Sequence, residues 1–353
     1  MGVVRSIILQ VKKRPRLEKS AAPPGIKTDY ERVLVVGTGG TIDEKGAAEI
    51  LSAEITPRFQ ESNMAVQRSL QYLQESRVGS DFLRIYAAFH EAACVYPITS
   101  RNRHSGERIP LVHAEEVATD AVVLAFQAHY KSAYQRLREV LEMVLLQLYF
   151  AKVEDKSMIG KWGRQEVKTP ALNIMLDEIA KDALYQSGDG KLKITNKLRR
   201  IYRDLGAYTH TRGVPTLNMG LMGSNILAFT ADALDRFFVL FASGCRLCIA
   251  CIAIFFPQAI IEVPAFAKFG HLDPVWLPRS DEVKCIRSVL SATELNVLED
   301  LAASNVWFQT VCAKVNSLPD LSPAEIEETY EFVVNSAPEA VDDALNRINE
   351  LLE

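Results

Sequence analysis

Apolar residues recur every three or four positions through residues 114–151, a stretch that contains neither glycine nor proline. The repeating positions are Leu137, Val140, Leu141, Val144, Leu145 and Leu148. An α-helix has 3.6 residues per turn, so this spacing places them on one side of a helix. The stretch therefore predicts one long amphipathic helix.

Capping and breaking residues predict three more helices: from Thr169-Pro170 to a break at Ser187–Gly190, from Thr195 to 211, and from near Asn225 to Pro257. Four helices joined by connections of short to moderate length favour an antiparallel bundle over residues 114–262. The fold class predicted for the whole chain is mainly α.

Four regions are expected along the chain, the bundle being one of them. Val33 to Val36 indicates a small strand, and the Gly-rich run Gly37-Thr38-Gly39-Gly40-Thr41 follows it directly. The expected regions are a flexible basic arm over 1–32, a mixed segment of unassigned role over 33–113, the bundle over 114–262, and an acidic helical extension over 263–353.

Charge is polarised between the two ends of the chain. Residues 1–32 hold eight basic and three acidic side chains, whereas residues 320–353 hold ten acidic side chains and only Arg347 as a base. Apolar residues still recur in the acidic segment, so it is expected to form a helical pair. Ser322-Pro323 followed by Glu325 is typical of a helix start.

Composition sets wider limits on function. With 353 residues, 48% of them hydrophobic, the chain can bury a large core, which excludes wholesale disorder. The formal charge of -4 provides no global attraction to nucleic acid, so any such contact needs a local basic patch. Six cysteines without a recognisable leader indicate a reduced compartment, and a cytoplasmic location is expected.

The third predicted helix carries the most informative residues. Arg203 and His210 lie seven positions apart, which places them within about 20° on one helix face. The same face carries Asn196, Arg199, Arg200, Gly206 and Ala207, and the opposite side carries the apolar residues Leu198, Ile201, Leu205 and Tyr208. The Arg/His face is therefore expected to lie outside the bundle core and to form a docking surface.

Arginine and histidine on one face suit RNA cleavage by attack of the ribose 2′-hydroxyl on the adjacent phosphate. The imidazole of His210 would act as general acid or base. The guanidinium of Arg203 would hold the charge that builds on the phosphate. This chemistry needs no metal ion and no cofactor.

These residues resemble the HEPN superfamily, helical bundles that include toxin and phage-defence ribonucleases. The superfamily motif is an arginine, often followed by Asn, Asp or His, and a histidine after four to six intervening residues. Arg203-Asp204 and His210 fit this motif. The resemblance covers residues 114–262, since the segment Arg138 to Glu142 and Leu148-Tyr149-Phe150 also look like the opening helix of HEPN-like proteins.

The resemblance implies an endoribonuclease in antiviral defence or in a toxin system, with RNA as substrate. It implies a homodimer in which two Arg203/His210 pairs meet at the interface. Asp204 would orient either Arg203 or His210. The residues that would bind RNA are Asn196, Arg199 and Arg200. Arg138 and Glu142 would support the site. A protein regulator or antitoxin would restrain the activity, and no membrane is involved.

Two other Arg/His pairs have the same spacing but fit less well. Arg84 and His90 lie about 120° from a shared face, and Ile85 follows the arginine. Pro110 interrupts the segment between Arg108 and His113.

Two alternatives come from other motifs. Val33 to Ile42 resembles the strand and loop of bacterial-type asparaginases, with Thr38 as nucleophile, but the supporting His-Gly-Thr-Asp-Thr run and the alternation of strands and helices are missing. Cys245, Cys248 and Cys251 have the spacing of iron-sulfur ligands, but the fourth ligand position is Phe255, so buried cysteines in an apolar helix are the preferred interpretation.

The apolar helix over 237–261 is also long enough to cross a membrane. Arg246 lies inside it, and a central bundle helix is favoured. The remaining rival to the ribonuclease is a non-catalytic helical scaffold of a defence system, which would use the charged ends of the chain to bind partner proteins.

Overall fold

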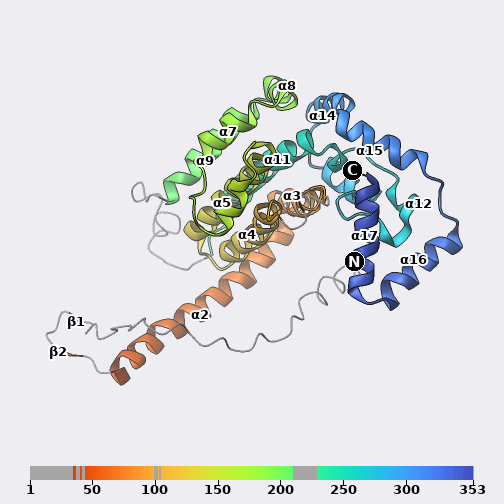
Figure 1. The fold of residues 1–353 in the computed structure, drawn as a ribbon. Helices are drawn as coiled ribbons and strands as arrows, with labels where there is room; N and C mark the ends of the chain where they lie inside the picture. Colours follow the sequence, from red (N-terminus) through yellow and green to blue (C-terminus); the bar gives the residue numbers. More distant parts are fainter. Residues whose placement is uncertain are drawn as a thin grey trace. The chain divides into compact units, whose positions relative to one another are not determined.

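The computed structural model describes residues 35–36, 40–41, 44–98, 102, 105–209 and 229–352 (Figure 1). The chain divides into two compact units, Met1–Thr56 and Pro57–Glu353. In the first, strand β1 (Val35–Val36) pairs antiparallel with β2 (Gly40–Thr41). Helix α2 (Glu44–Glu75) begins there and continues into the second unit. The predicted basic arm over 1–32 lies outside the described residues.

The described part of the second unit is built from helices. In chain order they are α3 (Arg77–Ala93), α4 (Ile109–Phe126), α5 (Tyr130–Lys152), α6 (Ser157–Gly163), α7 (Leu172–Ile179), α8 (Ala183–Leu192), α9 (Ile194–Thr209), α11 (Ala231–Phe255), η2 (Pro257–Ala259), α12 (Ala265–Phe269), η3 (Gly270–Leu272), α13 (Ser280–Arg287), α14 (Ala292–Ser304), α15 (Val306–Ser317), α16 (Pro323–Asn335) and α17 (Pro338–Leu352). The predicted mainly α fold class is confirmed.

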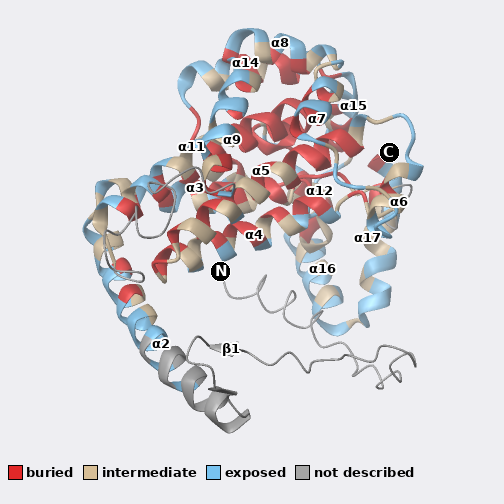
Figure 2. Ribbon diagram, turned by 90° about the vertical axis from the view of Figure 1, so that its left-hand side faces the viewer, coloured by how far each residue is buried: buried red, intermediate tan, exposed pale blue. Residues whose placement is uncertain are grey.

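Helix α11 lies at the centre of the larger core, with α3, α5, α8, α9 and α14 packed against it. Residues 247–260 are buried without interruption, and Figure 2 shows α5 and α11 as the most extensively buried part of the unit. Length and composition would allow α11 to cross a membrane, yet 72% of its most apolar window is buried inside the protein. An all-round apolar surface is what a helix with neighbours on several sides requires.

The prediction of one helix over residues 114–151 is wrong, because α4 and α5 form a helical hairpin there. Ala128 in the connection has φ 60°, and the amide of His129 donates to the carbonyl of Leu124 at 2.8 Å. A left-handed alanine costs about 1–2 kcal/mol. Extensive packing of α4 on α5 offsets this cost, since the fully buried alanines of α4 allow close approach: Ala114, Ala118, Ala121 and Ala125.

The second predicted helix is also divided, but at a different place from the one expected. Helix α7 ends at Ile179, and Asp182 caps α8 by accepting the amide of Tyr185 at 3.0 Å. The expected break at Ser187–Gly190 lies inside α8. A Cβ on Gly188 would lie 2.9 Å from Ile254 Cδ1 and 3.0 Å from a Leu301 methyl group. This glycine therefore permits close packing and does not form a turn.

The start of α9 differs from the expected Thr195 cap. Lys193 adopts left-handed φ 58° and ends α8, and the Asp189 carboxylate accepts the amide of Thr195 at 2.7 Å. Thr195 itself lies in the first turn of α9, where its hydroxyl contacts the hydroxyl of Tyr185 at 3.1 Å. Asp189, not Thr195, is therefore the residue that satisfies the free amide at this helix start.

The packed core extends beyond the predicted bundle range of 114–262. Helix α3 packs along α11 through aromatic rings, and Phe82 lies 4.4 Å from Phe238 and 5.1 Å from Phe241 between ring centroids. Phe82 is only 2% exposed. Part of the segment 33–113, to which the sequence assigned no role, therefore contributes to the main core.

The predicted acidic helical pair is present as α16 and α17. Ser322 and Glu325 form a reciprocal capping box at the start of α16, as expected from the sequence. Helix α16 has no buried residue, and it is joined to η3 by a hydrogen bond from the amide of His271 to Thr329 Oγ1 at 2.9 Å. A smaller core lies beside this pair, formed mainly by Trp276, Leu277, Phe308, Val311, Val315 and Leu352.

The Glu91 carboxyl group on α3 supplies a pH-dependent contribution to stability. Its pKa is raised by burial, and also by the nearby acidic side chains of Glu282, Asp281 and Glu115, while His90 opposes them. A raised folded-state pKa means that ionisation costs stability above that pKa, and the cost disappears as the pH falls below the unfolded value.

We expect Glu91→Gln to unfold at a higher urea concentration than the wild type at pH 7. The difference should narrow as the pH is lowered to 4, because the wild-type carboxyl group then becomes neutral. Glu61→Gln, on the exposed surface of α2, is the matched control. An unchanged urea midpoint for Glu91→Gln at pH 7 would show that ionisation of Glu91 does not lower the stability of the folded state.

Candidate nucleic-acid interface

Helix α9 separates into a buried side and an exposed side, as the sequence predicts. Leu198 and Leu205 are fully buried and Tyr208 nearly so, while Ile201 is partly buried against the same core. On the other side, the exposed polar residues are Asn196, Arg199, Arg200, Arg203 and Asp204. The helix therefore presents a row of guanidinium groups to solvent, anchored by its apolar side.

The structure describes two of the three predicted catalytic residues, Arg203 and Asp204. The side chain of Arg203 is 71% exposed, and its Nε lies 4.0 Å from Asp204 Oδ1. An exposed pair at this distance contributes little to stability, so Arg203 is free to bind an anion. His210 follows the last described residue of α9 and lies outside the described residues.

The predicted RNA-binding residues are accessible but not equivalent. Arg199 Nη2 lies 3.5 Å from Asp177 Oδ1 of α7, a pair in which both side chains are well exposed. Arg200 has no ion-pair partner among the described residues. Sequence reasoning omitted the exposed Lys193 and Lys197, which extend the cationic surface toward the start of α9. Their position within the same Lys/Arg-rich run was the available signal.

The predicted supporting pair Arg138 and Glu142 is more than a surface pair, because both residues contact Tyr202 of α9. Arg138 Nε donates to Glu142 Oε1 at 3.1 Å, and its guanidinium also donates to the Tyr202 hydroxyl. That hydroxyl in turn donates to Glu142 Oε1, and the guanidinium carbon lies 4.2 Å from the centre of the Tyr202 ring. This network joins α5 to α9 one residue before Arg203.

Burial and the hydrogen bond to Glu142 raise the pKa of Tyr202, so the phenol stays protonated and can donate. Gly206 lies next to the same network. A Cβ at that position would be 3.4 Å from Arg138 Nη1, and Gly206 is buried. The prediction that Gly206 belongs to the outer docking face is therefore wrong, because Gly206 is buried beside Arg138.

The other two Arg/His pairs have separate partners. Arg84 pairs with Asp81, while His90 Nδ1 lies 2.9 Å from Glu115 Oε1. His113 Nε2 lies 3.2 Å from Glu139 Oε1, and Pro110 stands in the first turn of α4 instead of interrupting a helix. Neither pair is joined by a contact between its own arginine and histidine in the described structure.

Buried cysteines agree with the preferred interpretation of the cysteine motif. Cys245, Cys248 and Cys251 are buried in α11, and burial raises the pKa of Cys251 to about 12. Burial disfavours the thiolate form of all three side chains. No group of three or more candidate metal ligands occurs among the residues that the structure describes.

The asparaginase-like motif has little structural support in the described ranges. Strands β1 and β2 pair with each other as a short antiparallel hairpin, with no parallel sheet among the described residues. Thr38, the expected nucleophile, lies outside them together with Gly37 and Gly39. Gly40 and Thr41 form β2.

Comparison with known proteins provides no relative. No family model matches the chain, and no curated protein or solved structure is significantly similar to it. The relation to the HEPN superfamily therefore stays a prediction that rests on the Arg203-Asp204 and His210 motif.

Proposed function

We propose that the protein binds RNA along the exposed side of α9 and cleaves it as an endoribonuclease without a metal ion. The observation that carries this proposal is the joint exposure of Arg199, Arg200 and Arg203 on a helix whose other side is anchored in the core. Guanidinium groups bind phosphates through paired hydrogen bonds. This face provides the local cationic surface that a chain of net charge -4 needs for such a ligand.

In the proposed reaction the ribose 2′-oxygen forms a bond to phosphorus while the bond from phosphorus to the 5′-oxygen breaks. His210 takes the proton of the 2′-hydroxyl or gives a proton to the leaving oxygen. Arg203 binds the phosphate oxygens as their charge builds, and Asp204 orients either Arg203 or His210 once RNA is bound. The products are a 2′,3′-cyclic phosphate and a 5′-hydroxyl end.

The HEPN resemblance extends the proposal to the assembly. Two copies would meet with their α9 faces together, so that two Arg203/His210 pairs line one RNA-binding groove. The Arg138, Glu142 and Tyr202 network would hold α9 in place on α5 while RNA binds. The same resemblance supports a toxin or phage-defence role with a restraining protein partner, and the proposed cytoplasmic location rests on the cysteine usage.

The test is incubation of the purified full-length protein with labelled total RNA and tRNA in EDTA. We expect cleavage that leaves 2′,3′-cyclic phosphate ends. RNA binding should weaken as salt rises, and the triple variant Arg199→Glu, Arg200→Glu, Arg203→Glu should lose it. The matched control is the reversal of three exposed cations elsewhere, Arg68, Arg77 and Lys284. Equal RNA binding by the two triple variants would contradict the proposed interface.

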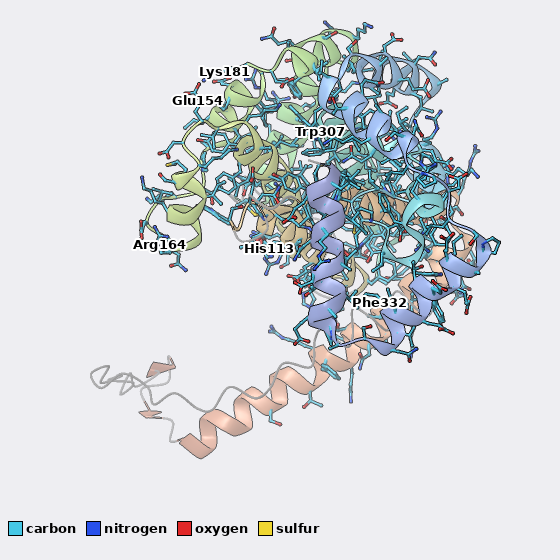
Figure 3. The ribbon with its side chains drawn as sticks, turned by 45° about the vertical axis from the view of Figure 1, so that its right-hand side comes forward. His113, Glu154, Arg164, Lys181, Trp307 and Phe332 are labelled. Carbon is cyan, nitrogen blue, oxygen red and sulfur yellow. The ribbon has the colours of Figure 1, made fainter. Side chains whose placement is uncertain are left out.

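A second candidate function is a non-catalytic helical scaffold of a defence system. Helix α16 favours it, because α16 has no buried residue and exposes Tyr330, Phe332 and Val334 among acidic side chains (Phe332 is labelled in Figure 3). A scaffold of this kind would be indifferent to charge reversal on α9. The same binding experiment therefore separates the two functions.

A further inference from the structure

A pocket of about 590 Å³ lies between helices α4, α5 and α6, lined by residues of these helices and by Arg108 just before α4. None of its lining residues belongs to α9, so it is distinct from the proposed RNA-binding face. Its volume is in the range of sites for small organic ligands.

The walls of the pocket are largely apolar. Ile109 and Val112 of α4 line the pocket and are 53% and 40% exposed, so they offer apolar surface that a ligand could cover. Met143 of α5 also lines the pocket and is 7% exposed. Trp162 of α6 completes the wall. Its indole Nε1 donates to Thr169 Oγ1 at 3.1 Å, and its ring packs edge-on against Phe150 at 5.6 Å. These contacts hold a flat apolar surface in position before any ligand binds.

The acidic side chains and the histidine of the pocket have partners within the protein, whereas Arg108 has no ion-pair partner in the described structure. Glu139 accepts a hydrogen bond from Arg136 at 2.6 Å, and it also contacts His113 (labelled in Figure 3) at 3.2 Å. The Glu116 carboxylate lies 3.8 Å from the other ring nitrogen of His113.

Arg108, by contrast, has no ion pair in the described structure, and its Nε is shielded from solvent without a hydrogen-bond partner. The Nε atom itself is closed to a ligand, but a guanidinium in the pocket wall without a carboxylate partner favours an anionic ligand, which would pair with its other N–H groups.

We propose that this pocket binds a small organic anion with a flat, ring-bearing apolar body. The anionic group pairs with the Arg108 guanidinium, and the body lies against Ile109, Val112 and Trp162. Apolar burial supplies most of the affinity, and the charge-assisted hydrogen bonds orient the ligand. This assignment does not depend on RNA cleavage, because it rests on different residues.

The test uses two fluorescent probes with the same ring system. 8-Anilinonaphthalene-1-sulfonate carries one anionic group, and N-phenyl-1-naphthylamine lacks it. We expect the sulfonate to bind the full-length protein at one site. Its affinity should fall about tenfold or more in Arg108→Met, which keeps the side-chain length but removes the charge. The neutral probe should bind Arg108→Met as it binds the wild type.

A pair of tryptophan substitutions on α4 locates the site. Val112→Trp fills the pocket and should remove binding of both probes, whereas Val123→Trp, on the same helix outside the pocket and also exposed, should leave it unchanged. Both positions are solvent-accessible, so both variants should fold. The proposal is overturned if the sulfonate binds Arg108→Met as tightly as the wild type, or if Val112→Trp and Val123→Trp behave alike.

Discussion

RNA cleavage is expected to fall about 10²–10³-fold when Arg203 is replaced by alanine, and about 10²–10⁴-fold when His210 is replaced. The first change removes the group that stabilises the phosphate charge in the transition state, and the second removes the proton-transfer group. The double variant should be little slower than the slower single variant, because the two residues act as a unit. Single-turnover cleavage of end-labelled tRNA measures all three rates.

Thermal unfolding distinguishes a loss of catalysis from a loss of the folded structure. The Arg203 side chain is 71% exposed, so Arg203→Ala should unfold at the wild-type temperature. The matched control is Arg200→Ala, which removes a guanidinium from the same face outside the motif. It should weaken RNA binding with little change in the single-turnover rate at saturating protein. A wild-type cleavage rate for Arg203→Ala would refute its catalytic role.

Replacement of Phe82 by alanine should lower the free energy of unfolding by about 3–5 kcal/mol, the usual cost of removing a buried aromatic ring. Phe82 is 2% exposed and lies against Phe237, Phe238 and Phe241 of α11, so its removal leaves a cavity between α3 and α11. Urea unfolding followed by circular dichroism measures the change.

Phe59→Ala is the control for this measurement, since Phe59 of α2 is 67% exposed. Its unfolding free energy should stay within about 0.5 kcal/mol of the wild-type value, as for most surface substitutions. Equal effects of the two alanine substitutions would show that α3 does not pack on α11 through this aromatic cluster.

A local sequence signal found the start of α16. The Ser322 and Glu325 capping box was visible in the sequence because all its hydrogen bonds join residues three positions apart. The hairpin between α4 and α5 carried no such signal. Its turn uses a left-handed Ala128 that only the packing of the two helices stabilises. The helix break predicted at Ser187–Gly190 is wrong because Gly188 serves close packing between helices. The residues it packs against, Ile254 and Leu301, are distant from it in the sequence.

In the proposed site, too, the sequence predicted what lies within one helix and missed a contact between helices. Periodicity alone placed Asn196, Arg199, Arg200 and Arg203 on the exposed side of α9, because a single helix face depends only on 100° per residue. Arg138 and Glu142 could be paired from their spacing of four, but Tyr202 could not be joined to them. That contact brings together residues about sixty positions apart in the sequence.

The amino-acid sequence by itself therefore determined the helical class, the acidic helical pair and the polar face of α9, all of which follow from spacing within one helix. Tertiary structure alone decided where the long helical stretch folds back, which residues brace α9, and that Arg108 lines an apolar pocket without a partner. These features depend on contacts between helices, and such contacts leave no periodic pattern within any one segment.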